Sequence, residues 1–212
     1  RLKARRVGGE RLEYWDRNAP LPGDDDRRFS WEEARTIVLD AFGGFDPRMA
    51  EIAGRFFAEE WIDAAPRPGK DPGAFCHPTV PTAHPFVLMN FYGRSRDITT
   101  LAHELGHGVH QVLAAEQGTL MSATPLTLAE TASVFGEMLV FRALLEREPD
   151  AGKRKRLLAG KVENMLNTVV RQIAFHQFEK LVHEERRRAE LPAERVAESW
   201  MQVPAESLGP AL

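Results

Sequence analysis

The chain has 212 residues, of which 43% are hydrophobic and 28% charged, a composition that suits one globular unit with a substantial core and excludes a disordered or fibrous protein. Its 28 basic and 31 acidic residues leave a net charge of -3, which argues against a broad affinity for nucleic acid or for a membrane surface. Because Cys76 is the only cysteine and no stretch approaches the roughly 18 uncharged apolar residues of a membrane helix, we expect a cytoplasmic protein without disulfides.

The N-terminal segment starts at Arg1 and has neither an initiator methionine nor the apolar run of a secretory signal. We expect a helical fragment over residues 1–15 and a loop over residues 18–26, with Tyr14 and Trp15 anchoring the join. This start predicts further chain upstream.

Two helices are predicted next. A capping box at residues 30–33 opens a helix that runs to about Phe42, where two glycines stop it. A second helix is predicted over residues 47–64, before the proline- and glycine-rich residues 65–73. Its apolar side is formed by Met49, Ile52, Phe56 and Trp61.

Short β-prone runs follow at residues 74–76 and 85–92, separated by a loop rich in proline, threonine and histidine. They predict a two-stranded hairpin. Because helical patterns dominate the rest of the chain, the predicted fold is mainly α.

The next helix is predicted over residues 97–115, with Asp97 as its N-cap. Its core stripe consists of Leu101, Leu105, Val109 and Val112.

Three further helices are predicted. Thr124 and Pro125 form the cap and first turn of a helix that ends near Glu146. A long helix over 151–189 and a short one over 193–202 precede a loop tail. Apolar residues hold helical spacing along the long helix: Leu158, Val162, Met165, Val169, Ile173, Phe178 and Leu181.

Within the helix predicted over 97–115, His103, Glu104 and His107 spell H-E-x-x-H. Histidines four residues apart lie on one helix face and can share one divalent metal ion, and the glutamate can accept a proton from the water that the metal activates. Both histidines lie off the aliphatic stripe, and Gly106 and Gly108 leave room there for another backbone or a substrate. Two surface histidines on an ordinary helix are the alternative.

A catalytic zinc ion usually has three protein ligands, and Glu130 is the candidate for the third. It lies on a helix that can turn back and pack antiparallel to the motif helix. Small neighbours that include Ser133 permit close approach. Alternatively, Glu130 and Thr127 form a T-x-x-E capping box. Glu137, two turns further on, either orients a ligating imidazole or is a solvated helix residue.

Other candidates have two interpretations each. His110, one turn beyond His107, either lies beside the metal site or faces a packed neighbour. His77 and His84 flank the predicted hairpin loop and either touch substrate or make backbone hydrogen bonds. Cys76 is interpreted as a small buried residue rather than a nucleophile.

Three segments carry a resemblance to a known family: HELGHGVH at 103–110, AETASVFGE at 129–137, and HPFVLMNF at 84–91, with Gly73-Ala-Phe before the last of them. On these segments the chain resembles the thimet oligopeptidase and oligoendopeptidase F family of zinc metallopeptidases, over nearly its whole length. The resemblance implies a mainly helical catalytic domain with a small β-hairpin or sheet beside an active-site channel. It also implies one zinc ion and short peptide substrates.

Carried over by position, the resemblance implies that His103, His107 and Glu130 are zinc ligands and that Glu104 is the catalytic base. Residues 85–91 resemble the family's edge strand, which holds a peptide backbone by strand addition. The expected activity is therefore that of a zinc-dependent endopeptidase. An aminopeptidase would need acidic groups to hold a free amine, and the sequence contains no such cluster.

The chain departs from the family in one respect. The family's tyrosine and histidine donors to the oxyanion have no counterpart here, and neither Tyr14 nor Tyr92 takes the right place. We therefore expect residues 1–212 to form part of a catalytic domain, with further chain upstream and downstream. The alternative function is a metal-stabilised peptide-binding fragment without turnover. The sequence leaves the oligomeric state open.

Overall fold

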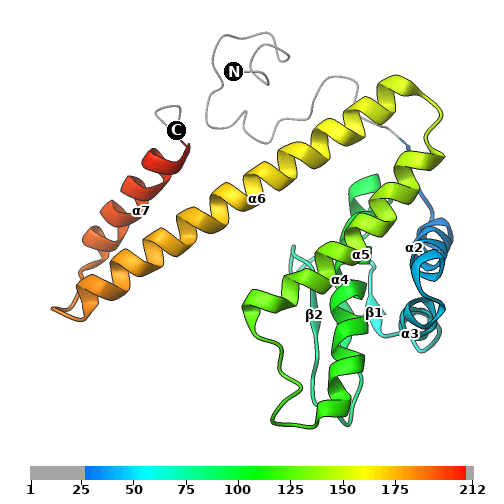
Figure 1. Cartoon of the computed structure of the whole chain (residues 1–212), viewed down its shortest axis with the longest axis horizontal. Coiled ribbons are helices and arrows are strands. Elements are labelled where there is room, and N and C mark those ends of the chain that lie inside the picture. The colour runs from blue at the N-terminus through cyan, green and yellow to red at the C-terminus, as the bar shows by residue number, and fades with distance from the viewer. Residues whose placement is uncertain (1–26, 209–212) are drawn as a thin grey trace. The chain divides into compact units, whose positions relative to one another are not determined.

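The computed structural model describes residues 27–208. These residues form helices and one small sheet, which confirms the expected mainly α fold (Figure 1). The helical fragment and loop predicted within residues 1–26, with the anchors Tyr14 and Trp15, lie outside the described residues.

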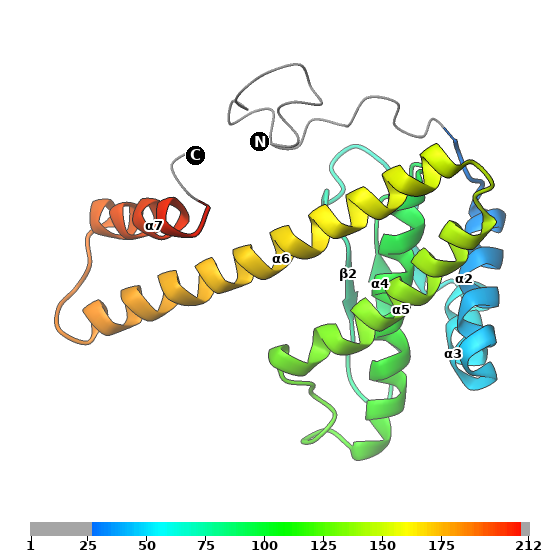
Figure 2. The same cartoon turned by 45° about the horizontal axis from the view of Figure 1, so that its top comes forward.

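The first of two compact units is Asp26–Asp150. Its helices are α2 (Trp31–Phe45), α3 (Pro47–Ala58), α4 (Ser95–Ala114) and α5 (Leu126–Arg147), with a short 3-10 turn η2 (Ala115–Gln117) after α4. Helices α4 and α5 make the most extensive packing in this unit and lie side by side in both views (Figure 1 and Figure 2). The predicted candidate residues of the metal site lie on these two helices.

Helix α2 begins as predicted and ends later. The Ser30 hydroxyl accepts a hydrogen bond from the Glu33 N–H, and the Glu33 carboxylate accepts one from the Ser30 N–H, which completes the capping box. The predicted stop after Phe42 is wrong, because the helix continues through two glycines to Phe45. A glycine costs about 1 kcal/mol in a helix interior, and packing of α2 against α3 and α5 offsets that cost.

Helix α3 ends at Ala58, and the predicted continuation to residue 64 is wrong. Glu60 adopts a left-handed φ of 58°, and the Trp61 N–H donates to the Phe56 carbonyl, so the chain turns out of the helix. Residues Ile62–Asp63 form strand β1 instead.

The sheet contains β1, β2 (Phe75–His77) and β3 (Phe86–Leu88), in the order β1-β3-β2. The antiparallel pairing of β2 and β3 confirms the predicted hairpin, and β1 adds a parallel strand on the other side of β3. The expectation that residues 85–91 form an edge strand is therefore wrong. Backbone groups of β3 are already paired on both sides, and among the described residues β2 is the edge strand that packs on α4.

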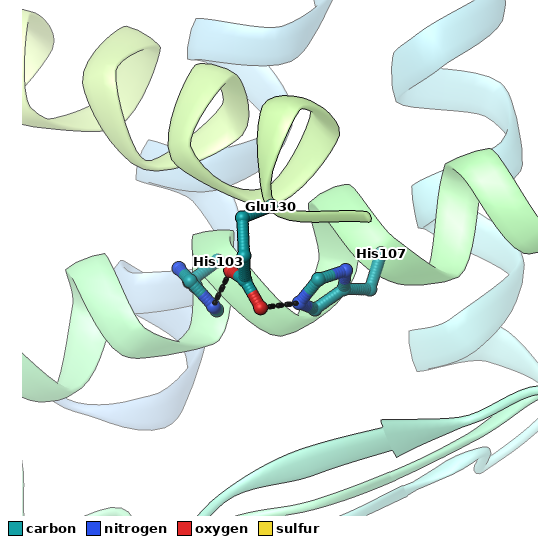
Figure 3. Close-up of side chains that lie close together, drawn as sticks. All are labelled: His103, His107 and Glu130. Atoms are coloured by element: carbon teal, nitrogen blue, oxygen red, sulfur yellow. Dashed lines mark ion pairs between the residues drawn. The ribbon is translucent and has the colours of Figure 1, made fainter. Parts of the chain in front are cut away.

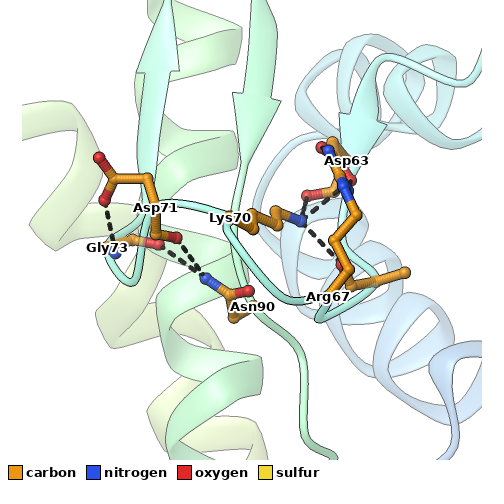
Figure 4. Close-up of polar contacts among 7 residues, drawn as sticks. Asp63, Arg67, Lys70, Asp71, Gly73 and Asn90 are labelled. Atoms are coloured by element: carbon orange, nitrogen blue, oxygen red, sulfur yellow. Dashed lines mark hydrogen bonds and ion pairs between the residues drawn. The ribbon is translucent and has the colours of Figure 1, made fainter.

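A buried lysine fixes the loop between β1 and β2 (Figure 4). The side chain of Lys70 is 1% exposed, and its Nζ donates to the backbone carbonyl and the carboxylate of Asp63. Hydrogen bonds from Arg67 and Lys70 hold the pKa of Asp63 well below its usual range. Asn90 Nδ2 donates to the Asp71 carbonyl, so polar contacts also tie the far end of this loop to the chain after β3.

Helix α4 buries the predicted stripe: Leu101, Leu105 and Val109, with Val112 partly buried. Its predicted start is wrong, because the helix begins at Ser95 with Arg94 as N-cap. The Asp97 carboxylate nevertheless serves the helix start by accepting hydrogen bonds from the N–H groups of Tyr92 and Arg94.

The second unit contains α6 (Ala151–Arg186) and α7 (Ala193–Leu208), so α7 is longer than the short helix predicted there. Arg195 on α7 pairs with Glu185 on α6, and Trp200 packs against two phenylalanines of α6. Apolar residues recur along α6 at the predicted spacing, but several are exposed: Leu158, Val162, Met165, Val169 and Ile173. Within the described part of the chain, no helix combines the length and hydropathy needed to cross a bilayer.

Candidate metal centre

Two histidines from α4 and one glutamate from α5 converge at the crossing of these helices (Figure 3). His103 Nε2 lies 3.2 Å from Glu130 Oε2, and His107 Nε2 lies 3.6 Å from Glu130 Oε1. The three potential ligand atoms all lie within 4.8 Å of one another. The i, i+4 spacing aligns the two imidazoles, and the approach of α5 supplies the carboxylate between them.

Glycine at the helix crossing permits this approach. A Cβ on Gly106 would lie 2.6 Å from the Ala132 carbonyl oxygen and 2.8 Å from the Ser133 Cα. Gly136 on α5 also lies close to the backbone of α4, because a Cβ there would lie 2.9 Å from the Ala102 carbonyl oxygen. Gly108 serves a different purpose, since it faces the ring of Phe56 on the core side of α4.

The donor set fits a zinc ion. Two imidazole nitrogens and a carboxylate are common zinc ligands, and bonds of about 2.0–2.2 Å in a tetrahedral arrangement separate ligand atoms by roughly 3.3–3.6 Å. His103 Nδ1 lies 3.4 Å from Glu137 Oε2 and can donate its proton there, which leaves the Nε2 lone pair facing the Glu130 carboxylate. Two facing acceptors require a cation between them, either a proton or a metal ion.

The pKa values of the two imidazoles are shifted in opposite directions. Burial opposes protonation of His103, but the hydrogen bond with Glu137 and the charges of Glu104 and Glu130 together raise its pKa. Burial lowers the pKa of His107, with the charge of Glu130 opposing and that of His103 adding to the effect. Proton binding at His103 therefore opposes metal binding more strongly than proton binding at His107 does.

Glu104 lies beside the three converging side chains and is 6% exposed. Burial raises its pKa to about 7, with His103 opposing this shift and the charge of Glu130 adding to it. A carboxylate with this pKa can both accept and return a proton near neutral pH.

The capping alternative for Glu130 is wrong. Helix α5 has Pro125 as its N-cap, so Thr127 already lies inside the helix and no side-chain cap is formed. The Glu130 carboxylate instead faces the two histidines and accepts a hydrogen bond from Ser133 Oγ over 2.7 Å.

This serine, noted in the sequence only for its small size, was missed as a candidate. A serine three residues after a glutamate in a helix was the available signal.

The other candidates lie at varying distance from the centre. His110 is near enough for its charge to lower the pKa of His107. His84 stacks on Trp61 with ring centroids 4.1 Å apart, and its Nδ1 lies 3.0 Å from the Pro85 carbonyl oxygen. His77 Nδ1 accepts a hydrogen bond from the N–H of Thr79 within its own loop. His77 therefore contacts its own loop, and His84 contacts its own loop and Trp61.

Cys76 is partly buried on β2, next to α4. Its Sγ lies 3.2 Å from Gln111 Oε1, and burial together with the negative charge of Glu104 raises its pKa to about 12. A thiol with this pKa stays protonated at neutral pH, in agreement with the interpretation that it is not a nucleophile.

The buried Glu104 carboxylate predicts a pH-dependent stability for the metal-free chain. Its pKa is about 7 in the folded chain and near 4.5 when exposed, so only the folded chain holds the proton between these values. The free energy of unfolding should therefore fall as pH rises from about 4.5 to about 7 and level off above that. The Glu104→Gln variant lacks this ionisable group. Between pH 5 and pH 8 its free energy of unfolding should therefore rise by roughly 2 kcal/mol relative to that of the wild type. Denaturant unfolding with a chelator present tests this, and parallel pH curves for the two chains would contradict it.

The sequence was compared with protein families and curated proteins. Residues 47–212 match the model of peptidase family M3. The chain is 28% identical over 207 residues to an oligoendopeptidase F homolog from Borreliella burgdorferi, which covers 96% of this chain and 35% of that protein. It is 31% identical over 160 residues to the chromosomal oligoendopeptidase F of Lactococcus lactis subsp. cremoris, which covers 75% of this chain and 26% of that protein. The chain thus spans about a third or less of the length of these relatives.

Solved structures share the fold. PZ peptidase A, determined with an inhibitor, aligns with a TM-score of 0.81 at 20% identity, covering 98% of this chain and 36% of that chain. At 20% identity, this similarity shows a shared fold and nothing more.

Proposed function

The chain belongs to peptidase family M3, and on this premise we propose that it carries the metal centre of a zinc-dependent endopeptidase that hydrolyses short peptides. The names of its relatives, oligoendopeptidase F, support this activity. The observation that carries the proposal is the convergence of two imidazoles and one carboxylate within 4.8 Å. We further propose that residues 1–212 are part of a larger catalytic domain.

His103, His107 and Glu130 would hold one zinc ion and leave a fourth position open, as catalytic zinc sites do. When bound, zinc supplies Lewis-acid activation of a water molecule and of the scissile carbonyl. Glu137 would hold the His103 ring through Nδ1, so that Nε2 stays directed at the ion.

Glu104 would move the proton during hydrolysis. Its carboxylate accepts the proton of the attacking water and passes it to the departing amine, so the residue acts first as a base and then as an acid. Burial favours this exchange, because it brings the carboxylate pKa to about 7. Glu104 is not a ligand in this scheme.

The peptide backbone would lie along β2. This strand is the sheet edge that packs on α4, and strand addition requires such an edge. A peptide would replace the hydrogen bond that Gln111 Nε2 donates to the Cys76 carbonyl. Strand β3, between its two neighbours, does not meet that requirement.

Metal removal tests the proposal directly. We expect the purified chain to contain one zinc ion by elemental analysis and to cleave an internally quenched peptide with both ends blocked. A chelator should abolish cleavage, and added zinc should restore it. Cleavage that persists without metal would overturn the proposal, while metal-dependent peptide binding without cleavage would favour a binding fragment. Blocked ends exclude an aminopeptidase as the source of the signal.

A further inference from the structure

Ser133 is a buried polar residue in contact with the candidate metal centre. It lies on α5, one turn after Glu130, and is 0% exposed. Its Oγ donates a hydrogen bond to Glu130 Oε2 over 2.7 Å, the distance of a short hydrogen bond to a charged acceptor. The same Oε2 lies 3.2 Å from His103 Nε2. The hydroxyl and the His103 imidazole therefore contact the same carboxylate oxygen.

A backbone contact competes for the same proton. Ser133 Oγ also lies 3.1 Å from the Glu130 carbonyl oxygen, and serines inside helices often bond a preceding carbonyl in this way. A hydroxyl has one proton to donate, and the carboxylate is both the closer and the charged acceptor. Ser199 on α7 provides the comparison, because it is equally buried and its Oγ donates to the Arg195 carbonyl over 3.0 Å.

The helix crossing restricts what residue 133 can be. A Cβ on Gly106 would lie 2.8 Å from the Ser133 Cα, so α4 and α5 approach backbone to backbone at this point. Serine is small enough for this crossing and still carries a hydrogen-bond donor. Its position is therefore fixed by both helices that carry the candidate ligands.

Glu130 needs such an anchor. Its side chain is 56% exposed, so the long carboxylate arm would sample several rotamers if nothing held it. We infer that Ser133 is a positioning residue that holds the Glu130 carboxylate between the two imidazoles, so that the metal site is formed before the ion arrives. This inference rests on the proposed function, since it assigns Ser133 a role toward the proposed metal.

Zinc affinity tests the inference without any activity assay. Ser133→Ala should raise the zinc dissociation constant by about 10- to 100-fold, measured by competition with a chromophoric chelator. Ser199→Ala, which also removes a buried hydroxyl, should leave it unchanged. Circular dichroism of the metal-free chains should be the same for both variants and the wild type.

A double-mutant cycle separates positioning from packing. If Ser133 acts through the carboxylate, Ser133→Ala should change zinc affinity no further in a Glu130→Ala background. An equal effect in both backgrounds would overturn the inference, because the serine would then act through the helix crossing. Equal affinities of the wild type and Ser133→Ala would overturn it too while leaving the proposed zinc site intact. A wild type that binds no zinc would instead overturn the proposed function.

Discussion

Replacing Glu104 with glutamine is expected to lower the rate of peptide hydrolysis by roughly 10²- to 10⁴-fold, the range associated with general acid–base catalysis. Glutamine keeps the size of the side chain but cannot accept and return a proton at neutral pH. The three candidate ligands His103, His107 and Glu130 are untouched, so one zinc ion per chain should remain. The substitution should therefore separate metal binding from turnover.

The measurement combines kcat/KM on a blocked, internally quenched peptide with zinc analysis of the same preparation. Glu51→Gln is the matched control, because Glu51 is an exposed glutamate on α3, and both its rate and its zinc content should equal the wild type. Unchanged turnover in Glu104→Gln would refute the role of this carboxylate. Loss of zinc together with activity would show that Glu104 supports the metal site instead of the proton transfer.

The half of the site that lies on α4 could be predicted from the sequence because its geometry is local. In a helix, residues at i and i+4 share a face, so His103 and His107 had to point the same way once the helix formed. The buried stripe of α4 follows from the same periodicity, and Leu101 and Leu105 lie in the core. Neither inference required knowledge of any other element.

The half of the site on α5 depends on how two helices pack. The spacing around Glu130 suited both a ligand and a helix cap. The N-cap at Pro125 and the contacts of the carboxylate with the two histidines exclude the cap. Ser133 was noted in the sequence only for its small size, although its hydroxyl bonds the Glu130 carboxylate within the same helix. The i, i+3 spacing of Glu130 and Ser133 was the local signal for this bond, but the approach of Glu130 to the two histidines depends on tertiary packing.

Tertiary packing also explains where the predicted helices and strands differ from the observed ones. Helix α2 passes through the glycines that were expected to end it, since its neighbours stabilise it more than the glycines weaken it. Strand β1 was assigned to a helix because its partner β3 lies far along the chain, and the pairing of Ile62 with Val87 has no local signature. This third strand places β3 inside the sheet and leaves β2 at the edge.

Gly106→Ala is expected to destabilise the chain and weaken its zinc site together. The added methyl group would lie 2.6 Å from the Ala132 carbonyl oxygen and 2.8 Å from the Ser133 Cα, and both are backbone atoms that cannot rotate away. Helices α4 and α5 must then move apart, at a cost of about 1–3 kcal/mol in the free energy of unfolding. The same movement draws Glu130 away from the histidines, so zinc affinity should fall at least about tenfold.

Gly54→Ala is the matched control, since Gly54 lies inside helix α3 and an added Cβ would meet nothing within 4 Å. Alanine is the better helix former, so this variant should be more stable than the wild type by about 0.5–1 kcal/mol and should bind zinc equally well. Opposite signs for one substitution at two helical glycines would trace the effect to the crossing of α4 and α5. If Gly106→Ala instead matched Gly54→Ala in denaturant unfolding and zinc competition, close approach of these helices would not be what forms the site.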